Sequence, residues 1–309
     1  MLVSVVIPTY NRARTIMPAV ESAMGQTYRD LEIIIVDDGS TDDTMEVLKP
    51  LAGRIVLIRQ DNAGPSAARN RGVVEAKGDI IAFLDSDDHW LPDKISRQVD
   101  LMRRGGPEMA CCVCNALVKG IDGADLGTTF DFARLGFDFN EGEWTNPQDV
   151  LATRFLLFNQ VVAVRREAFD RVGGFNENLR LLEDFELSMK LSGIGKWGVI
   201  REPLVVKFND TNGIGVECMA DKAKHAATSA NVISGILGSG QALNPAARRH
   251  LEQSVADLEA EIRIMSLLKQ GSFPARAYGQ ALQFQLRARG AMRRRSPAWP
   301  KFAGKALPA

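Results

Sequence analysis

Short apolar runs alternate with helix-like stretches over the first hundred residues. The strand-like runs lie at 2–7, 31–36, 54–59 and 80–84, and helical patterns lie near 14–24, 42–48 and 66–76. Apolar runs of this length, bounded by Gly or polar residues, are typical of buried strands. Strands separated by helices imply right-handed crossovers and a parallel sheet. We therefore predict an α/β fold with a doubly wound, mostly parallel sheet flanked by helices.

Polar residues follow each predicted strand. In chain order they are Pro8, Thr9, Tyr10 and Asn11, then Asp37, Asp38, Gly39 and Ser40, then Asp61 and Asn62, and finally Asp85, Ser86 and Asp87. Ligands of open α/β sheets bind in the crevice beyond the carboxyl ends of the strands. The four strand ends therefore predict one binding site at that edge.

The run after the fourth strand holds three carboxylates within four residues, Asp85, Asp87 and Asp88. Like charges this close repel one another, so such a run is commonly neutralised by a cation. Carboxylate oxygens suit Mg²⁺ or Mn²⁺ better than zinc. The alternative is a polar turn with solvated acids. An EF-hand loop does not fit, because His89 and Trp90 stand where its glycine turn should be.

Exclusion narrows the ligand of this crevice. The chain has no G-x-G-x-x-G after its first strand and no P-loop motif, so neither NAD binding nor P-loop chemistry is indicated. Tyr10 can stack on a base, and Asp38 can accept a hydrogen bond from a ring N–H. Arg69, with a metal at Asp87, can bind a diphosphate. These residue types fit a nucleoside diphosphate, while the alternative for 37–42 is a turn that caps a helix.

Four sequence blocks together carry a family resemblance, at 3–11, 35–42, 62–70 and 83–88. In this order they resemble family 2 glycosyltransferases of the GT-A fold, over roughly residues 1–210. The resemblance implies a nucleotide-sugar donor, most often a UDP-sugar, and inversion at the anomeric carbon. It also implies a divalent metal, Mn²⁺ or Mg²⁺, held by the D-x-D motif. Asp87 and Asp85 would be its metal-binding residues. The donor-binding residues would be Pro8, Thr9, Tyr10, Asn11, Asp38, Asn62, Gly64, Arg69, Asp85 and Ser86.

The pair Glu183-Asp184 opens an amphipathic pattern, where the helix dipole favours negative charge. Helix capping is therefore one interpretation. The resemblance covers this block too, and it implies that Asp184 is the base that deprotonates the acceptor hydroxyl. We assign acceptor contacts to Trp90, Gly173, Gly174 and Glu183. Retention would require a second carboxylate as nucleophile, and the sequence nominates none.

The chain departs from the family pattern at Asn209, which stands roughly where many relatives carry a His near the metal. This leaves the third side-chain ligand of the metal open, and water can fill that position. Two other functions stay open as alternatives. A sugar-1-phosphate nucleotidyltransferase would carry a Gly-rich, Arg-containing loop in place of Pro8-Thr9-Tyr10. A non-catalytic nucleotide-sugar-binding module would share the donor motifs.

The second half is predicted to contain a helix at 92–104, a strand at 109–118, a long loop near the acceptor site at 119–146 and a strand at 159–164. A disordered excursion is the alternative for the loop. We expect a glycosyltransferase domain at 1–215, with a donor half at 1–105 and an acceptor half at 106–215, and a helical, basic region at 216–309.

The composition is that of an ordinary globular chain, with 309 residues, 45% hydrophobic and 25% charged. The Cys residues, at 111, 112, 114 and 218, form no C-x-x-C pair, which favours buried thiols over zinc or disulfides. The first residues lack a basic leader, and no run approaches the roughly 18 apolar residues of a membrane span. We therefore expect a cytoplasmic protein.

Charge is unevenly distributed along the chain. Ten basic and no acidic residues follow Glu261, and they are interrupted by aromatic residues such as Tyr278 and Trp299. This pattern suits an anionic membrane surface better than nucleic acid, so we expect a protein peripheral to the inner face of the membrane and no nucleic-acid partner. Apolar residues at 251, 255, 258, 262 and 265 form a seam that either packs onto the catalytic domain or forms a homodimer.

Overall fold

The N-terminal half of the sheet is parallel. β1 (Val3–Thr9) lies between β2 (Leu31–Asp37) and β4 (Ile80–Phe83), and β3 (Val56–Arg59) extends the sheet beyond β2. Every residue of β1 and β4 is buried, as expected for strands covered on both faces. Their carboxyl ends meet at one edge of the sheet. The order β4-β1-β2-β3 confirms the predicted doubly wound arrangement.

Helices follow β1, β2 and β3 in the predicted places. They are α1 (Ile16–Met24), α2 (Thr44–Leu48) with the 3-10 turn η1 (Lys49–Leu51), and α3 (Pro65–Glu75). α3 packs closely on β1 through Gly72, where an added Cβ would lie 2.4 Å from Val6 Cγ1. This close approach sets the depth at which the first turn of α3 reaches the sheet edge.

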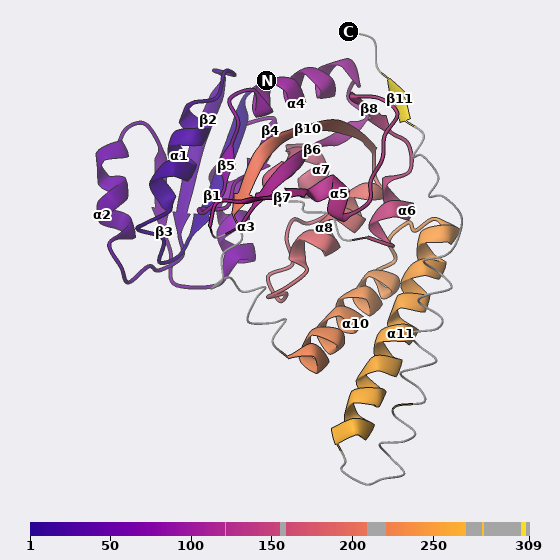
Figure 1. Cartoon of the computed structure of the whole chain (residues 1–309). Coiled ribbons are helices and arrows are strands. Elements are labelled where there is room, and N and C mark those ends of the chain that lie inside the picture. The colour runs from indigo at the N-terminus through magenta and orange to yellow at the C-terminus, as the bar shows by residue number, and fades with distance from the viewer. Residues whose placement is uncertain (121, 155–158, 209–220, 270–279, 281–303, 307–309) are drawn as a thin grey trace. The chain divides into compact units, whose positions relative to one another are not determined.

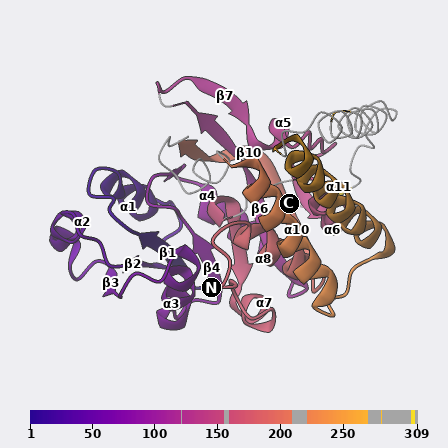
Figure 2. The same ribbon diagram turned by 90° about the horizontal axis from the view of Figure 1, so that it is seen from below.

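The rest of the sheet is mixed, and its full order is β11-β8-β10-β6-β9-β4-β1-β2-β3. Its strands are β5 (His89–Trp90), β6 (Met109–Lys119), β7 (Asp125–Thr128), β8 (Glu141–Trp144), β9 (Val162–Arg165), β10 (Lys196–Phe208) and β11 (Gly304–Ala306). β9 is antiparallel to both β4 and β6 and so joins the two halves. β10 runs parallel to β6 and antiparallel to β5, while β7 lies at the outer end of β6 (Figure 2).

Two predictions in this half need correction. The segment 119–146 is not one long loop, because it contains β7, α5 (Thr129–Phe132) and β8. A capping box starts α5: Asp131 N donates to Thr128 Oγ1 at 3.2 Å, and Thr128 N donates to Asp131 Oδ2 at 3.3 Å. The strand predicted at 159–164 begins later, since its first three residues form the 3-10 turn η2 (Asn159–Val161).

Further along the chain lie the helices α4 (Lys94–Arg104), α7 (Arg166–Arg171) and α8 (Glu183–Ser192). α4 buries Ile95, Val99 and Met102, which recur at helical spacing. In β6, Cys111, Cys112 and Cys114 are buried and free, as predicted. Full burial of one Ile, Val or Met side chain of α4 stabilises the fold by about 1.5–3 kcal/mol. Cys218 lies outside the described residues.

The structure is a computed structural model that describes residues 1–120, 122–154, 159–208, 221–269, 280 and 304–306 (Figure 1). The chain forms two units, and the sheet belongs to the one comprising Met1–Pro147, Arg154–Asp210 and Phe302–Ala309. The other comprises Gln148–Thr153 and Thr211–Lys301. Asn209 and most of the basic tail lie outside the described residues.

The second unit is helical in its described part. It holds most of α6 (Pro147–Leu151), together with α10 (Lys222–Gly238) and α11 (Pro245–Lys269). Asp221 caps α10 by accepting from Ala223 N and Lys224 N, both at 3.1 Å. α10 and α11 pack against each other. Of the predicted apolar seam, Leu251 is fully buried and the other four residues are half-buried.

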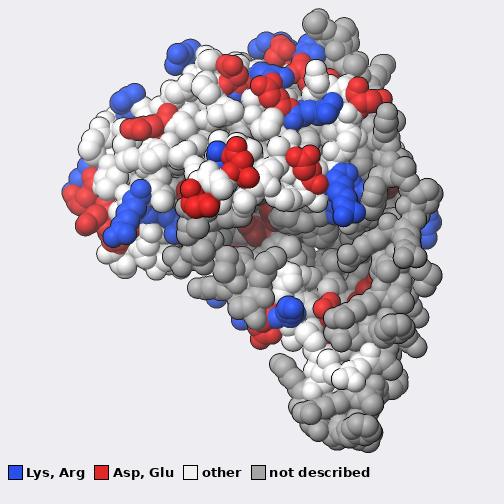
Figure 3. All heavy atoms as spheres, viewed as in Figure 1, with Lys and Arg blue, Asp and Glu red and all other residues white. Residues whose placement is uncertain are grey.

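The face shown in Figure 3 carries interspersed acidic and basic side chains over its described part. Within the described residues, no helix combines the length and the apolar character needed to cross a membrane.

Candidate active site

Asn11 joins the loops that follow β1 and β2. Its backbone N–H donates to Ser40 Oγ at 2.9 Å, and its Oδ1 accepts from Thr41 N at 2.8 Å. Asn11 adopts φ 52°, a left-handed conformation that Asn tolerates better than most residues. Next to it, Thr9 is buried whereas Tyr10 is 46% exposed. The exposed ring of Tyr10 is available for stacking.

Asp38 shapes the turn that leads into α3. Its Oδ1 accepts from Gln60 Nε2 at 2.8 Å and from Ala63 N at 2.9 Å, and its Oδ2 accepts from Gly64 N at 2.8 Å. Gly64 has φ 94°, which only glycine adopts readily. These contacts hold the segment 60–64; within 37–42 itself the turn is closed by Ser40 N, which donates to Asp37 Oδ1 at 3.3 Å. The carboxylate of Asp38 is buried among these donors.

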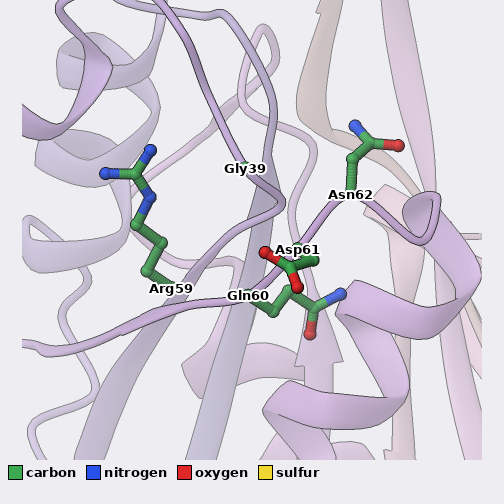
Figure 4. Close-up of a pocket in the computed structure, with 5 residues that line it drawn as sticks. All are labelled: Gly39, Arg59, Gln60, Asp61 and Asn62. Atoms are coloured by element: carbon green, nitrogen blue, oxygen red, sulfur yellow. The ribbon is translucent and has the colours of Figure 1, made fainter.

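A pocket of about 550 Å³ opens at the carboxyl ends of β2 and β3. Gly39, Arg59, Gln60, Asp61 and Asn62 line it. Figure 4 shows Arg59 and Asn62 on opposite sides, with Gly39 and Asp61 between them. The volume is within the roughly 300–1,000 Å³ of small-molecule sites. Asn62, one of the predicted donor-binding residues, therefore borders a pocket of suitable size.

Asp85, Asp87 and Asp88 form an acidic cluster just after β4. One carboxylate oxygen from each lies within 4.8 Å of the others. The side chains of Asp85 and Asp87 are 24% and 21% exposed, whereas that of Asp88 is fully buried. Two accessible carboxylates beside a buried one are an oxygen donor set that suits a hard divalent cation. The predicted metal-binding residues therefore lie together.

Basic side chains from two other segments approach this cluster. Arg12 Nη2 lies 3.6 Å from Asp87 Oδ2, and Lys207 Nζ lies 3.3 Å from Asp88 Oδ2. Asp88 Oδ1 also accepts from Phe208 N at 3.0 Å. Asp88 thus ties the end of β10 to the cluster.

These charges change how the cluster titrates. Burial, reinforced by Asp85, raises the pKa of Asp87 against the opposing effect of Lys207 and Arg12. Burial likewise raises the pKa of Asp88 to about 7, although Lys207 opposes it. Burial alone would lower the pKa of Lys207, but Asp88, Asp85 and Asp87 raise it above its ordinary value. Lys207 is therefore a permanent cation at neutral pH.

Arg69, on α3, connects the acidic cluster with the start of α8. Its Nη2 donates to Asp85 Oδ1 at 2.8 Å, and its Nη1 donates to Glu183 Oε1 at 3.0 Å. The guanidinium is buried and lies 5.3 Å from the ring centroid of Phe175. Burial would lower its pKa, but Asp85 and Glu183 raise it. A buried charge held by two carboxylates has a fixed position.

Asp184 occupies the first turn of α8 and is half-buried. Leu182 precedes this helix in a left-handed conformation, with φ 61°. Asp184 Oδ1 accepts from Phe185 N at 2.8 Å. Burial and the adjacent Glu183 carboxylate raise the pKa of Asp184 to about 7. A carboxyl group with this pKa can accept a proton near neutral pH.

The glycine pair predicted to contact the acceptor forms a tight turn, with φ 79° at Gly173 and 68° at Gly174. Asn70, the neighbour of Arg69 on α3, accepts from Phe175 N at 3.0 Å and so holds this turn. Trp90, also assigned to the acceptor, is only 3% exposed and lies in the core. The burial of Trp90 gives that assignment no support.

Four residues in or beside the cluster had no assigned site role. They are Asp88, Arg12, Lys207 and Gln160. Gln160 Nε2 donates to Asp85 Oδ2. Asp88 belongs to the acidic run itself, so its signal was present in the sequence. Lys207 and Gln160 carry no local signal, because only the pairing of distant strands brings them to Asp85 and Asp88.

Comparison with solved structures identifies the architecture as the GT-A fold. The structure of S. aureus TarS 1-349 in complex with UDP-GlcNAc matches with a TM-score of 0.65 and 19% identity, over 93% of this chain and 80% of that one. The mannosyltransferase PcManGT from Pyrobaculum calidifontis, in complex with GDP-Man and Mn²⁺, matches with a TM-score of 0.57 and 20% identity, over 94% and 84% of the two chains. The predicted fold is confirmed.

Residues 4–170, more than half of the chain, match the model of glycosyl transferase family 2. The chain therefore belongs to this family, as the sequence blocks predicted. Among curated proteins, the UDP-Glc:alpha-D-GlcNAc-diphosphoundecaprenol beta-1,3-glucosyltransferase WfaP of Escherichia coli is 48% identical over 33% of this chain and 41% of its own length. The chondroitin synthase of Pasteurella multocida is 33% identical over 63% of this chain and 19% of its own. The matches thus span less than half of these relatives.

Proposed function

We propose that this chain transfers a sugar from a nucleotide-diphosphate sugar, with UDP as the nucleotide, to an acceptor hydroxyl, in the assembly of a cell-surface polysaccharide or glycolipid. The observation that carries the proposal is the buried Arg69, which joins Asp85 of the acidic cluster to Glu183 beside Asp184. Donor-side and acceptor-side groups are thereby held in one constellation. The names of the two curated relatives, a UDP-Glc glucosyltransferase and a chondroitin synthase, support this class of reaction.

The residues of the acidic cluster fit a divalent cation, because their oxygens lie within 4.8 Å of one another and two of the three side chains are accessible. Asp87 and Asp85 would hold Mn²⁺ or Mg²⁺. Such an ion, when bound, supplies Lewis-acid neutralisation of the charge that develops on the departing diphosphate. Arg12 adds a positive charge from the protein next to Asp87.

On the acceptor side, Asp184 is proposed to take the proton of the attacking hydroxyl. Its raised pKa, about 7, matches the base to a neutral operating pH. Attack from the face opposite to the diphosphate inverts the anomeric centre. Glu183 is paired with Arg69 at 3.0 Å, so it holds the start of α8, and Asp184 beside it is the proposed base.

On the donor side, Tyr10 and the pocket at the ends of β2 and β3 are proposed to receive the base, with Asn62 at its rim. Asp38 is proposed to contribute through the turn that it organises. The other donor-binding assignments given above are retained as proposals, as are the acceptor contacts of Gly173, Gly174 and Glu183.

The basic segment beyond Glu261 is proposed to hold the protein at an anionic membrane surface on the cytoplasmic side. A relative with a diphosphoundecaprenol-linked acceptor is consistent with a lipid-linked saccharide as acceptor. We retain the proposed division into a donor half at 1–105, an acceptor half at 106–215 and a helical region at 216–309. The homodimer also remains a proposal.

A donor screen tests the proposed function. Purified protein is incubated with UDP-, GDP- and dTDP-sugars, with Mn²⁺ or Mg²⁺, and released nucleotide is measured. We expect metal-dependent release from a UDP-sugar that EDTA abolishes and a saccharide acceptor accelerates. Tight nucleotide binding without release under any of these conditions would instead identify a non-catalytic binding module.

A further inference from the structure

The carboxylate of Asp85 is held from two sides. Arg69 Nη2 donates to Oδ1 at 2.8 Å, and Gln160 Nε2 donates to Oδ2. The two donors come from α3 and from η2, so they approach from separate parts of the fold. Rotation of the carboxylate would break one hydrogen bond or the other. Asp85 therefore has one preferred orientation, which Arg69 alone would not impose.

Gln160 is itself anchored. The residue is 2% exposed, and its backbone carbonyl oxygen accepts a hydrogen bond from Trp90 Nε1 at 3.0 Å. Trp90 is buried, with Lys94 Nζ 3.9 Å from its ring centroid. The amide nitrogen of Gln160 is the atom that faces Asp85. A rigid chain of contacts thus runs from Trp90 through Gln160 to Asp85.

The other end of the Gln160 amide is not satisfied. Its Oε1 is buried and has no hydrogen-bond partner among the described residues. Buried Gln26, by comparison, satisfies both ends of its amide. Gln26 Nε2 donates to Leu91 O at 2.8 Å, and its Oε1 accepts from Ile95 N at 3.0 Å. Gln160 thus places its N–H on Asp85 while its Oε1 stays unpaired.

We propose that Gln160 is a positioning residue for metal and nucleotide binding, acting through Asp85. The inference rests on the proposed function, in which Asp85 and Asp87 hold the cation. A carboxylate that binds a metal is oriented by the groups hydrogen-bonded to it, and loss of such a group costs about 10–100-fold in affinity or activity. Gln160 supplies this support from the acceptor half of the chain to a residue of the donor half.

The test compares Gln160→Met with Gln26→Met. Both substitutions keep the length of the side chain and remove a buried amide, but only the first removes a hydrogen bond to Asp85. Titration calorimetry with UDP and with GDP, each with Mn²⁺, should show binding about 10-fold or more weaker in Gln160→Met. The Mn²⁺ concentration for half-maximal rate should rise, and excess Mn²⁺ should restore most of the rate. Gln26→Met should lower the melting temperature without changing either quantity.

Trp90→Phe provides a second variant if Gln160→Met does not fold. It keeps an aromatic ring in the core and removes only the N–H that holds the Gln160 carbonyl. We expect a smaller loss of UDP affinity and a smaller rise in the Mn²⁺ concentration for half-maximal rate than in Gln160→Met. Excess Mn²⁺ should again restore most of the rate. A folded Gln160→Met protein with parental UDP affinity and Mn²⁺ dependence overturns the inference and leaves the proposed function standing. A parent chain that binds no nucleotide with any metal overturns both.

Discussion

Arg69 Nη1 donates to Glu183 Oε1 at 3.0 Å, although the two residues are separated by 114 positions in the chain. The contact links α3, which follows the donor-side strand β3, to Glu183, the first residue of α8, which Asp184 follows directly. The same guanidinium also binds Asp85. One buried cation therefore sets the distance between the acidic cluster and the proposed base, which a transfer reaction requires to be constant.

Replacement of Arg69 should therefore destabilise the fold as well as the site. Arg69→Met leaves Asp85 and Glu183 without their cation, and removal of one partner from a buried ion pair costs about 3–5 kcal/mol. Arg71→Met is the matched control on the same helix, because Arg71 forms an exposed pair with Glu75. That pair should contribute roughly 0.3–0.5 kcal/mol. Urea unfolding of both variants measures the difference, and equal losses would show that the Arg69 bridge is not a stabilising contact.

Asp87→Asn and Asp184→Asn should separate binding from chemistry. Loss of Asp87 removes a proposed metal ligand, so metal-dependent UDP affinity and transfer rate should fall together. Loss of Asp184 removes the proposed base, so turnover should fall by roughly 10²–10⁴-fold with near-parental UDP affinity. Titration calorimetry with UDP and Mn²⁺, beside steady-state transfer, measures both quantities.

Melting curves provide the control for this comparison, since Asp184 also lies in the first turn of α8. Neither variant should melt well below the parent. Near-normal turnover in a well-folded Asp184→Asn protein would remove Asp184 as the base and would direct attention to Glu183.

The transfer rate should depend on pH through Asp184, whose pKa is raised to about 7. A base acts when deprotonated, so the rate at saturating donor should fall about tenfold per pH unit below pH 7 and level off above it. Because the pKa of Asp88 is also about 7, donor binding must be measured over the same range. A rate that stays constant from pH 5.5 to 8 at constant donor occupancy would contradict this assignment.

The same raised pKa predicts how stability changes with pH. Between about pH 4, the ordinary range of an Asp, and pH 7, the folded chain binds a proton at Asp184 that the unfolded chain has released. The contribution of Asp184 to stability therefore decreases as pH rises through this window. The Asp184→Asn variant lacks this titrating group. Its melting temperature should therefore rise relative to that of the parent as the pH increases from 5 to 8. An unchanged difference between the two proteins would show that the folded pKa is ordinary.

The basic tail should bind anionic membranes through charge. Each Lys or Arg near such a surface contributes up to about 1 kcal/mol, and ten lie beyond Glu261. The whole protein should sediment with vesicles of mixed anionic and neutral lipid. A form truncated after Gly271 should stay in the supernatant. High salt should weaken binding of the whole protein, and vesicles of neutral lipid alone should not bind it. Equal binding of both forms, or binding unaffected by salt, would exclude this role for the tail.

Local patterns in the sequence determined the first half of the fold. β1, β2, β3 and β4 and the helices between them formed where the apolar runs and polar strand ends predicted. For β1 and β4 the apolar runs reflect burial on both faces of a parallel sheet, whereas β3, at the edge of the sheet, is only partly buried. The four family blocks also lie in this half, and they predicted the acidic cluster, while a separate block at 183–184 nominated Asp184. In the segment 119–146, Trp144 packs on Trp197 of β10 with ring centroids 6.0 Å apart, a contact between residues distant in the chain that the local sequence does not reveal.

Tertiary structure decided how the predicted groups are joined. Arg69 was predicted to lie near the nucleotide, but its partnership with Glu183 depends on the packing of α3 beside α8. Lys207 and Gln160 approach Asp88 and Asp85 only because β10 and η2 end near β4. Hydrogen bonds and ion pairs between residues distant in the chain leave no periodic pattern in the local sequence. The sequence alone therefore determined which chemical groups are present, and the fold determined which of them are in contact.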